Sequence, residues 1–154
     1  MQFLSDNWME DYEKALKKHF SPEKTTTRVS VKIAEVFRNV PEGGDKWMSI
    51  EWEDGAVIEF CHGKGAETAP RDADFTFSGE YESWIRMLSL KDDMVNSIMS
   101  GKVVMRGNMR NFQPAMKPFV GAILLQGAVR PRGNVILRGL LRKGAVIVDR
   151  KMFS

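Results

Sequence analysis

A hairpin signal constrains the fold of this chain most. Apolar and polar residues alternate from Met48 to Trp52, as on a strand with one buried face. Asp54-Gly55, a dipeptide typical of two-residue hairpin turns, follows and returns the chain through residues 57–60. The segment therefore predicts an antiparallel hairpin within a meander of strands.

A helix and a further strand are expected before this hairpin. Ser5 or Asp6 can cap the helix, which runs to about Phe20 with apolar residues at spacings of three and four. The period changes to two over residues 29–33, which indicates a half-buried strand. The apolar positions then shift by one within residues 34–36, and this shift predicts a β-bulge.

The rest of the body alternates short strands with helices. Residues 62–70 have the composition of a loop. The remaining elements are expected as a strand at 74–78, two short helices within 80–99, a strand at 102–106 and a helix at 109–126. Pro114 and Pro118 lie inside the last helix and are expected to kink it.

The composition is that of an average globular domain, with 43% hydrophobic and 28% charged residues among 154. The longest apolar stretch, residues 119–125, is far shorter than the ~20 residues that cross a bilayer, so we expect no transmembrane helix. Residues 1–8 lack the basic start and apolar core of a signal peptide. The single cysteine, Cys61, fits a reducing compartment, and we expect a cytoplasmic protein.

Positive charge is concentrated at the C-terminal end. Residues 128–154 contain seven basic residues and one acidic residue, whereas residues 1–127 contain 16 basic and 19 acidic residues. Aromatic residues in the body alternate with acidic residues such as Glu51 and Glu59, whereas stacking surfaces for nucleic acid carry basic ones. Nucleic acid is therefore not an expected partner.

The fold of this C-terminal extension stays open between two alternatives. Residues 134–143 have the pattern of a basic amphipathic helix, whereas residues 135–137 and 145–148 can pair as a hairpin. Gly139 disfavours the helix, and the β-branched residues favour the hairpin. The residues expected to contact an anionic membrane surface or another partner are Arg130, Arg132, Arg138, Arg142 and Lys143. A solvated extension, or one that packs within an oligomer, would carry the same charge.

Catalytic and metal-binding patterns are missing from the sequence. His19 and His62 are the only histidines, so the supply of general bases for a nucleophile is small. Cys61 and His62 are adjacent, and on a strand their side chains would point to opposite faces. No set of three or four metal-ligating residues has a recognised spacing. We expect no enzymatic activity, no metal and no cofactor.

Methionine is concentrated in one part of the chain. Six of the ten methionines lie within residues 87–116. Methionine side chains adapt to irregular surroundings, which suits a deformable apolar cavity. An ordinary hydrophobic core explains the same cluster, so the methionines alone do not decide.

Several motifs follow one another within residues 73–116. They are an Ala-Asp-x-Thr strand, two short helices, a Gly-Lys strand that ends in Gly-Asn-Met, and a closing helix. This order resembles the sterol carrier protein type 2 family. The matching residues are Ala73, Asp74, Thr76, Gly101, Lys102, Val103, Met105, Gly107, Asn108 and Met109. The resemblance covers about residues 3–126, and the prolines of the closing helix and the extension after Gly127 depart from it.

The resemblance implies an α+β fold in which a five-stranded, mostly antiparallel sheet is covered by helices and encloses an apolar cavity. Residues 1–126 would form this domain, with residues 127–154 as a basic extension. The implied function is binding or transfer of an intracellular lipid, such as a sterol, a fatty acid or another acyl chain. The helical and strand periods direct eight residues toward the cavity, namely Trp84, Leu88, Ile98, Met105, Met109, Phe112, Met116 and Phe119.

A second class of function stays open beside lipid binding. The same fold can serve as an interaction or regulatory module whose cavity is filled by its own side chains. An enzyme acting alone is least expected, because the polar residues that catalysis needs are missing. A lipid that copurifies with the protein would favour the first class, and a lipid-free mass would favour the second.

Overall fold

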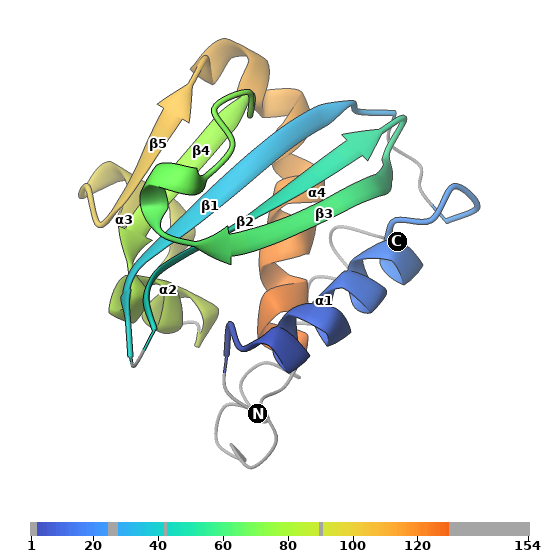
Figure 1. Cartoon of the computed structure of the whole chain (residues 1–154). Coiled ribbons are helices and arrows are strands. Elements are labelled where there is room, and N and C mark those ends of the chain that lie inside the picture. Colours follow the sequence, from blue (N-terminus) through green and yellow to red (C-terminus); the bar gives the residue numbers. More distant parts are fainter. Residues whose placement is uncertain (1–2, 25–27, 42, 90, 130–154) are drawn as a thin grey trace.

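Five strands form one mixed sheet in the computed structural model, which describes residues 3–24, 28–41, 43–89 and 91–129 (Figure 1). The strands are β1 (Val31–Val40), β2 (Gly44–Glu53), β3 (Ala56–Lys64), β4 (Phe75–Glu80) and β5 (Val103–Gly107). Their order across the sheet is β3-β2-β1-β4-β5. β1 and β4 are parallel, and the other neighbouring pairs are antiparallel. The predicted five-stranded, mostly antiparallel sheet is therefore confirmed.

The hairpin between β2 and β3 has the predicted turn. Asp54 has a φ of 49° and Gly55 a φ of 83°. Positive φ at both central residues matches the twist of the flanking strands, and Asp-Gly tolerates this conformation. β3 extends to Lys64, so His62 lies in the strand and not in the predicted loop.

The predicted β-bulge near residue 34 is wrong. The pairing of β1 with β2 is regular from Val31 to Phe37, and the register shifts only between Phe37 and Val40. Ala34 and Val36 are buried although they point away from Ile33 and Phe37. A short 3-10 helix, η1 (Ala66–Thr68), packs over β1 and β2 on that side. The apolar residues follow one another because both faces of β1 are covered.

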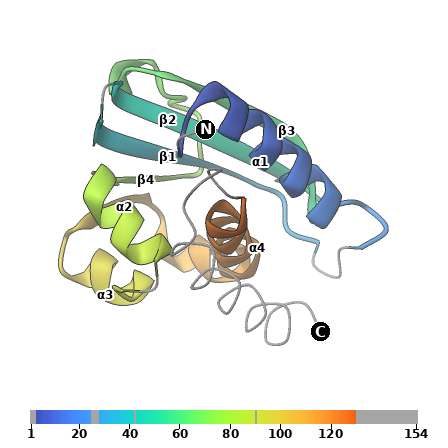
Figure 2. The same ribbon diagram turned by 90° about the horizontal axis from the view of Figure 1, so that it is seen from below.

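Helices cover one face of the sheet, which we call the inner face (Figure 2). They are α1 (Asp6–His19), α2 (Tyr81–Leu88), α3 (Met94–Met99) and α4 (Met109–Ala128). Ring contacts join α1, α2 and α4 to that face: Tyr12 lies 5.6 Å from Phe60, Trp84 lies 4.9 Å from Phe37, and Phe112 lies 5.0 Å from Phe75. α3 packs against α2 and β5.

Sequence signals account for the start of α1 and for the bend of α4. The Ser5 hydroxyl accepts a hydrogen bond from the backbone N–H of Trp8, so the predicted cap of α1 is confirmed. α4 runs through Pro114 and Pro118 as a single helix. Figure 2 shows its first turns running across the view while its later turns are seen end-on, as expected for a helix kinked at prolines.

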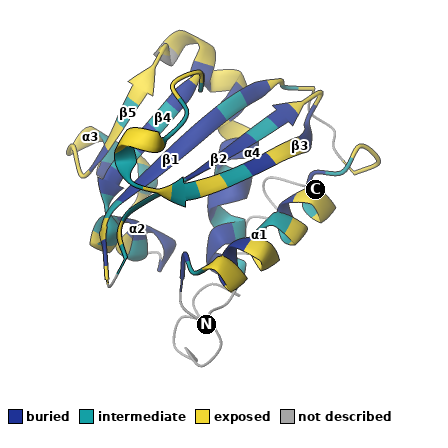
Figure 3. Cartoon of the chain, viewed as in Figure 1, coloured by how far each residue is buried: buried dark blue, intermediate teal, exposed yellow. Residues whose placement is uncertain are grey.

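Buried residues concentrate in the centre of the sheet and along the helices that pack on it (Figure 3). The largest side chains that solvent does not reach include three of the four tryptophans, Trp8, Trp52 and Trp84. One connected hydrophobic core therefore fills the layer between the inner face and the helices.

Candidate functional site

The layer between the inner face and α2 and α4 brings together four of the residues predicted to line a cavity. Trp84 and Leu88 on α2 are buried, as are Phe112 and Phe119 on α4. Phe119 stacks on Phe77 of β4 with 4.2 Å between the ring centroids. These residues belong to one apolar cluster, which has the chemical character that a lipid chain requires.

The other predicted wall residues differ in position. Ile98 and Met105 are partly buried and pack against the margin of the core. Met116 is 42% exposed, so the prediction that it shares the buried side of α4 is wrong. The buried side of this helix passes through Ala115 and Phe119, and Met116 is rotated about 100° from Ala115. The side chain of Met109 lies outside what the structure describes.

A pocket of about 590 Å³ opens where the first turns of α4 meet the sheet. Its apolar lining includes Val31 of β1, Phe75 of β4, and Pro114 and Ala115 of α4. Polar residues, namely Arg28, Ser30, Asp74, Asn108 and Asn111, also line it. Phe75 and Ala115 belong to the core, so this pocket borders the apolar layer. The volume of this pocket lies within the range of small-molecule sites.

The two halves of α4 are held differently. Near its C-terminal end, the carbonyl of Ala122 accepts from the Tyr12 hydroxyl at 2.8 Å, and the carbonyl of Val129 accepts from Trp8 Nε1 at 2.8 Å. In the first half, Pro114 and Pro118 have no N–H, so the helical carbonyls four residues earlier lack their usual donor. The pocket borders this first half.

A carboxyl group is buried in the same layer, and sequence reasoning missed it. Glu35 on β1 is 1% exposed, and Gln126 on α4 donates a hydrogen bond from Nε2 to its carboxyl group, at 2.7 Å from Oε2 and 3.0 Å from Oε1. Burial raises the pKa of Glu35 to about 8, and the hydrogen bond from Gln126 opposes this shift. Among the described residues, Gln126 Oε1 is buried and has no hydrogen-bond partner.

The alternation of residues along β1 was the sequence signal that could have predicted the burial of Glu35. Glu35 occupies the same face of β1 as Ile33 and Phe37, both of which are buried. A bulge that turned Ala34 and Val36 inward would have turned Glu35 to the solvent side. Burial also raises the pKa of Tyr12, and the nearby Glu35 adds to this shift.

Some predicted features lie outside the described residues. The five basic residues expected to contact a membrane, and both alternatives for the C-terminal extension, lie beyond residue 129. No group of three or more potential metal ligands occurs in the part of the chain that the structure describes. Within the same residues, no helix is long and apolar enough to span a membrane.

One family model matches part of this sequence, and several solved structures share its fold. The model of the SCP-2 sterol transfer family matches residues 41–119. No curated protein sequence matches the chain. A conserved hypothetical protein of Thermus thermophilus has a similar structure, with a TM-score of 0.66 and 16% identity over 87% of this chain and 94% of that one.

Two structures of sterol carriers are also similar. A crystal structure of sterol carrier protein 2 has a TM-score of 0.65 and 15% identity, over 81% of this chain and 97% of that one. The sterol carrier protein domain 2 of Helicoverpa armigera has a TM-score of 0.50 and 21% identity, over 81% of this chain and 90% of that one. At these identities, the likeness establishes that the fold is shared.

Proposed function

The chain belongs to the SCP-2 sterol transfer family, and from this we propose that it binds the apolar chain of a lipid between the inner face of its sheet and α4. Family membership supports binding or transfer of lipids or sterols in general. The proposal places the ligand at the pocket formed by Val31, Phe75, Pro114 and Ala115 and in the adjoining apolar layer.

The observation that carries the proposal is the uneven hydrogen bonding of α4, because ring contacts of Phe112, and no side-chain hydrogen bonds among the described residues, hold its first half to the sheet. Hydrogen bonds from Trp8, Tyr12 and Gln126 hold its C-terminal part to α1 and to the sheet. The prolines lie in its first half, next to the pocket. Movement of these first turns would enlarge the pocket without breaking the bonds at the other end. A carrier needs such a part, because its ligand has to enter and leave.

The energetics of a lipid chain agree with transfer. Burying about 14 methylene groups is worth roughly 11 kcal/mol relative to water, at ~0.8 kcal/mol for each group. A bilayer offers nearly the same gain, so moving the lipid between the protein and a membrane changes its free energy little. Exchange at so small a cost in free energy suits a carrier, which has to release its ligand.

We extend the proposal to the surface that the protein uses at a membrane. The basic residues Arg130, Arg132, Arg138, Arg142 and Lys143 would contact anionic headgroups while a lipid is loaded or released. Each basic residue near an anionic surface contributes about 1 kcal/mol. The alternative function, an interaction module with a closed interior, would need no such contact with lipid.

Probe binding tests the proposed site. Ala115→Met adds a side chain of three more heavy atoms at the wall of the pocket, where Ala115 is 1% exposed. We expect a fluorescent acyl probe to bind this variant at least fivefold more weakly than the unchanged protein. Gln113→Met adds a methionine at an exposed position of the same helix and should leave the affinity unchanged.

Overpacking can also unfold a core, so thermal denaturation of both variants accompanies the titration. Weaker probe binding by a folded Ala115→Met variant supports the site. Equal affinities of the two variants for the probe would exclude this pocket as the lipid site.

A further inference from the structure

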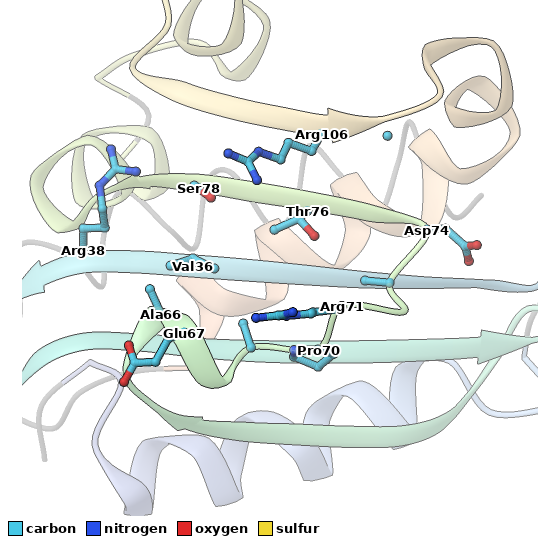
Figure 4. A pocket seen from close by; sticks show the side chains of 13 residues that line it. Val36, Arg38, Ala66, Glu67, Pro70, Arg71, Asp74, Thr76, Ser78 and Arg106 are labelled. Carbon is cyan, nitrogen blue, oxygen red and sulfur yellow. The ribbon is translucent and has the colours of Figure 1, made fainter.

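The face of the sheet opposite the helices, which we call the outer face, carries a second pocket, of about 620 Å³. Its floor contains short side chains: Val36 on β1, and Thr76 and Ser78 on β4. On one side, β5 contributes Arg106, the register partner of Thr76. On the other side, the connection from β3 to β4 contributes Arg71 (Figure 4). The small floor residues leave a hollow between these two walls.

The wall formed by the connection is fixed in place. The Thr68 hydroxyl accepts a hydrogen bond from Trp47 Nε1 at 2.8 Å and lies 2.8 Å from the carbonyl oxygen of Lys64. Trp47 itself packs so closely on Gly63 that a Cβ at this glycine would lie 2.8 Å from the indole ring. η1 is thus clamped over β2, and Arg71 follows shortly after it.

The arginines of the pocket differ in their partners. Arg38 forms an ion pair with Glu80, with Nε 3.3 Å from Oε1. The side chains of Arg71 and Arg106 form no ion pair or hydrogen bond with another residue in the described part of the chain. In Figure 4 their side chains extend in the same direction on either side of Thr76. Two unpaired guanidinium groups thus flank a floor that carries the hydroxyls of Thr76 and Ser78.

The carboxylates at this pocket are placed at its ends. Asp74 accepts a hydrogen bond from the backbone N–H of Lys32 at 2.8 Å. The carboxylate of Glu67 lies over Gly65, where a Cβ would contact it. Figure 4 shows these two acidic side chains at opposite ends, away from the space between Arg71 and Arg106. The middle of the pocket is therefore its positive part.

We propose that this pocket binds the phosphate group of an organic phosphate ester, held between Arg71 and Arg106 over the Thr76 and Ser78 hydroxyls. Guanidinium groups bind phosphate oxygens through paired, charge-assisted hydrogen bonds, and hydroxyl groups donate further ones. Val36, Ala66 and Pro70 line the same pocket, so the ester carries an apolar part beside its phosphate. A pocket of this volume accommodates a small molecule of that kind. The site lies on the opposite face of the sheet from the proposed lipid site and does not depend on it.

Phenyl phosphate, which joins a phosphate to an apolar ring, is the probe for a titration at low salt. We expect it to bind the unchanged protein, and Arg71→Gln and Arg106→Gln each to weaken this binding at least fivefold. Arg110→Gln removes an exposed arginine on α4 and should have no effect. Binding of the fluorescent acyl probe should stay the same in all three variants, which separates this site from the lipid site.

Two further ligands identify the source of the phosphate. Inorganic phosphate should bind more weakly than phenyl phosphate, because it lacks the apolar part. Binding of phosphatidic-acid vesicles that is also lost in Arg71→Gln and Arg106→Gln would assign the phosphate to a lipid headgroup, and binding of phenyl phosphate alone would assign it to a soluble ester. The proposal is overturned if phenyl phosphate does not bind, or if both variants bind it like the unchanged protein.

Discussion

Gln126 donates a hydrogen bond from Nε2 to Glu35, 2.7 Å from one carboxylate oxygen, and so joins the C-terminal part of α4 to the central strand of the sheet. Both side chains are 1% exposed. A buried carboxyl group is costly when ionised, and the raised pKa of Glu35, about 8, means that the folded protein holds this group protonated at neutral pH.

The first prediction concerns the pH dependence of stability. The pKa of Glu35 is about 8 in the folded state, compared with an ordinary value of 4.5. Between these two pH values, the folded state keeps a proton that the unfolded state has lost. The contribution of Glu35 to the free energy of unfolding is therefore fully present below about pH 4.5 and is lost as pH rises toward about pH 8. At ~1.4 kcal/mol for each pKa unit, the total loss is about 5 kcal/mol at most.

The variant Glu35→Gln tests this dependence, because it keeps the shape of the side chain and removes the titration. Urea denaturation between pH 5 and pH 9 should show that the unchanged protein loses stability relative to Glu35→Gln as the pH rises. Glu53→Gln, at an exposed position at the end of β2, should keep the pH dependence of the unchanged protein. A constant difference between Glu35→Gln and the unchanged protein across this range would contradict the prediction.

The second prediction concerns the contact between α1 and α4. Tyr12→Phe removes the hydroxyl that donates to the Ala122 carbonyl at 2.8 Å, and we expect it to lower the free energy of unfolding by about 1 kcal/mol. Tyr81→Phe removes a hydroxyl that makes no hydrogen bond to another described residue and should cost less. Denaturation of both variants measures the difference. Equal stabilities would mean that the Tyr12 bond does not hold α4.

The third prediction concerns the margin of the apolar layer. Met105 on β5 is partly buried against the core, whereas the neighbouring Val104 is 46% exposed on the outer face. Met105→Trp adds bulk toward the layer, so we expect a fluorescent acyl probe to bind it several-fold more weakly. Val104→Trp adds the same ring on the other face and should leave probe binding unchanged. Unchanged affinity in Met105→Trp would remove Met105 from the lipid site.

The fourth prediction concerns membranes. Replacing Arg138, Arg142 and Lys143 together with glutamine should reduce cosedimentation with anionic vesicles, and high salt should do the same to the unchanged protein. The matched control replaces the exposed Lys14, Lys17 and Lys18 of α1 and removes the same amount of charge. Equal loss of vesicle binding in both triple variants would show an effect of net charge alone and would argue against a docking role of the C-terminal extension.

Local signals predicted the secondary structure well, because they act within a few residues. Asp54 and Gly55 determine the hairpin turn because both tolerate a positive φ. Ser5 determines the start of α1 because its hydroxyl accepts a hydrogen bond from the backbone N–H of Trp8, three residues later. The strands and helices of residues 74–128 lie close to their expected ranges for the same reason. The parallel pairing of β1 with β4 depends on segments about 40 residues apart, and no local pattern encodes it.

Positions that depend on packing between distant segments were harder to predict. The apolar residues Ala34 and Val36 suggested a bulge, although they are buried under the connection from β3 to β4. That connection follows some 30 residues later, so the local sequence does not show that it covers them. Met116 was placed inward because the helical period alone could not decide between neighbouring arcs of α4. Arg71 and Arg106 come from different segments, so only the folded sheet brings them to one pocket.

Native mass spectrometry of the freshly purified full chain, followed by lipid extraction, tests the central claim most directly. If the protein is a lipid carrier, a noncovalent adduct with the mass of a lipid will accompany the polypeptide, disappear on extraction, and be reduced in the folded Ala115→Met variant but retained in Gln113→Met. A polypeptide that is lipid-free as purified, and that stays free after incubation with a fatty acid and with a sterol, would contradict the claim and favour an interaction module with a closed interior.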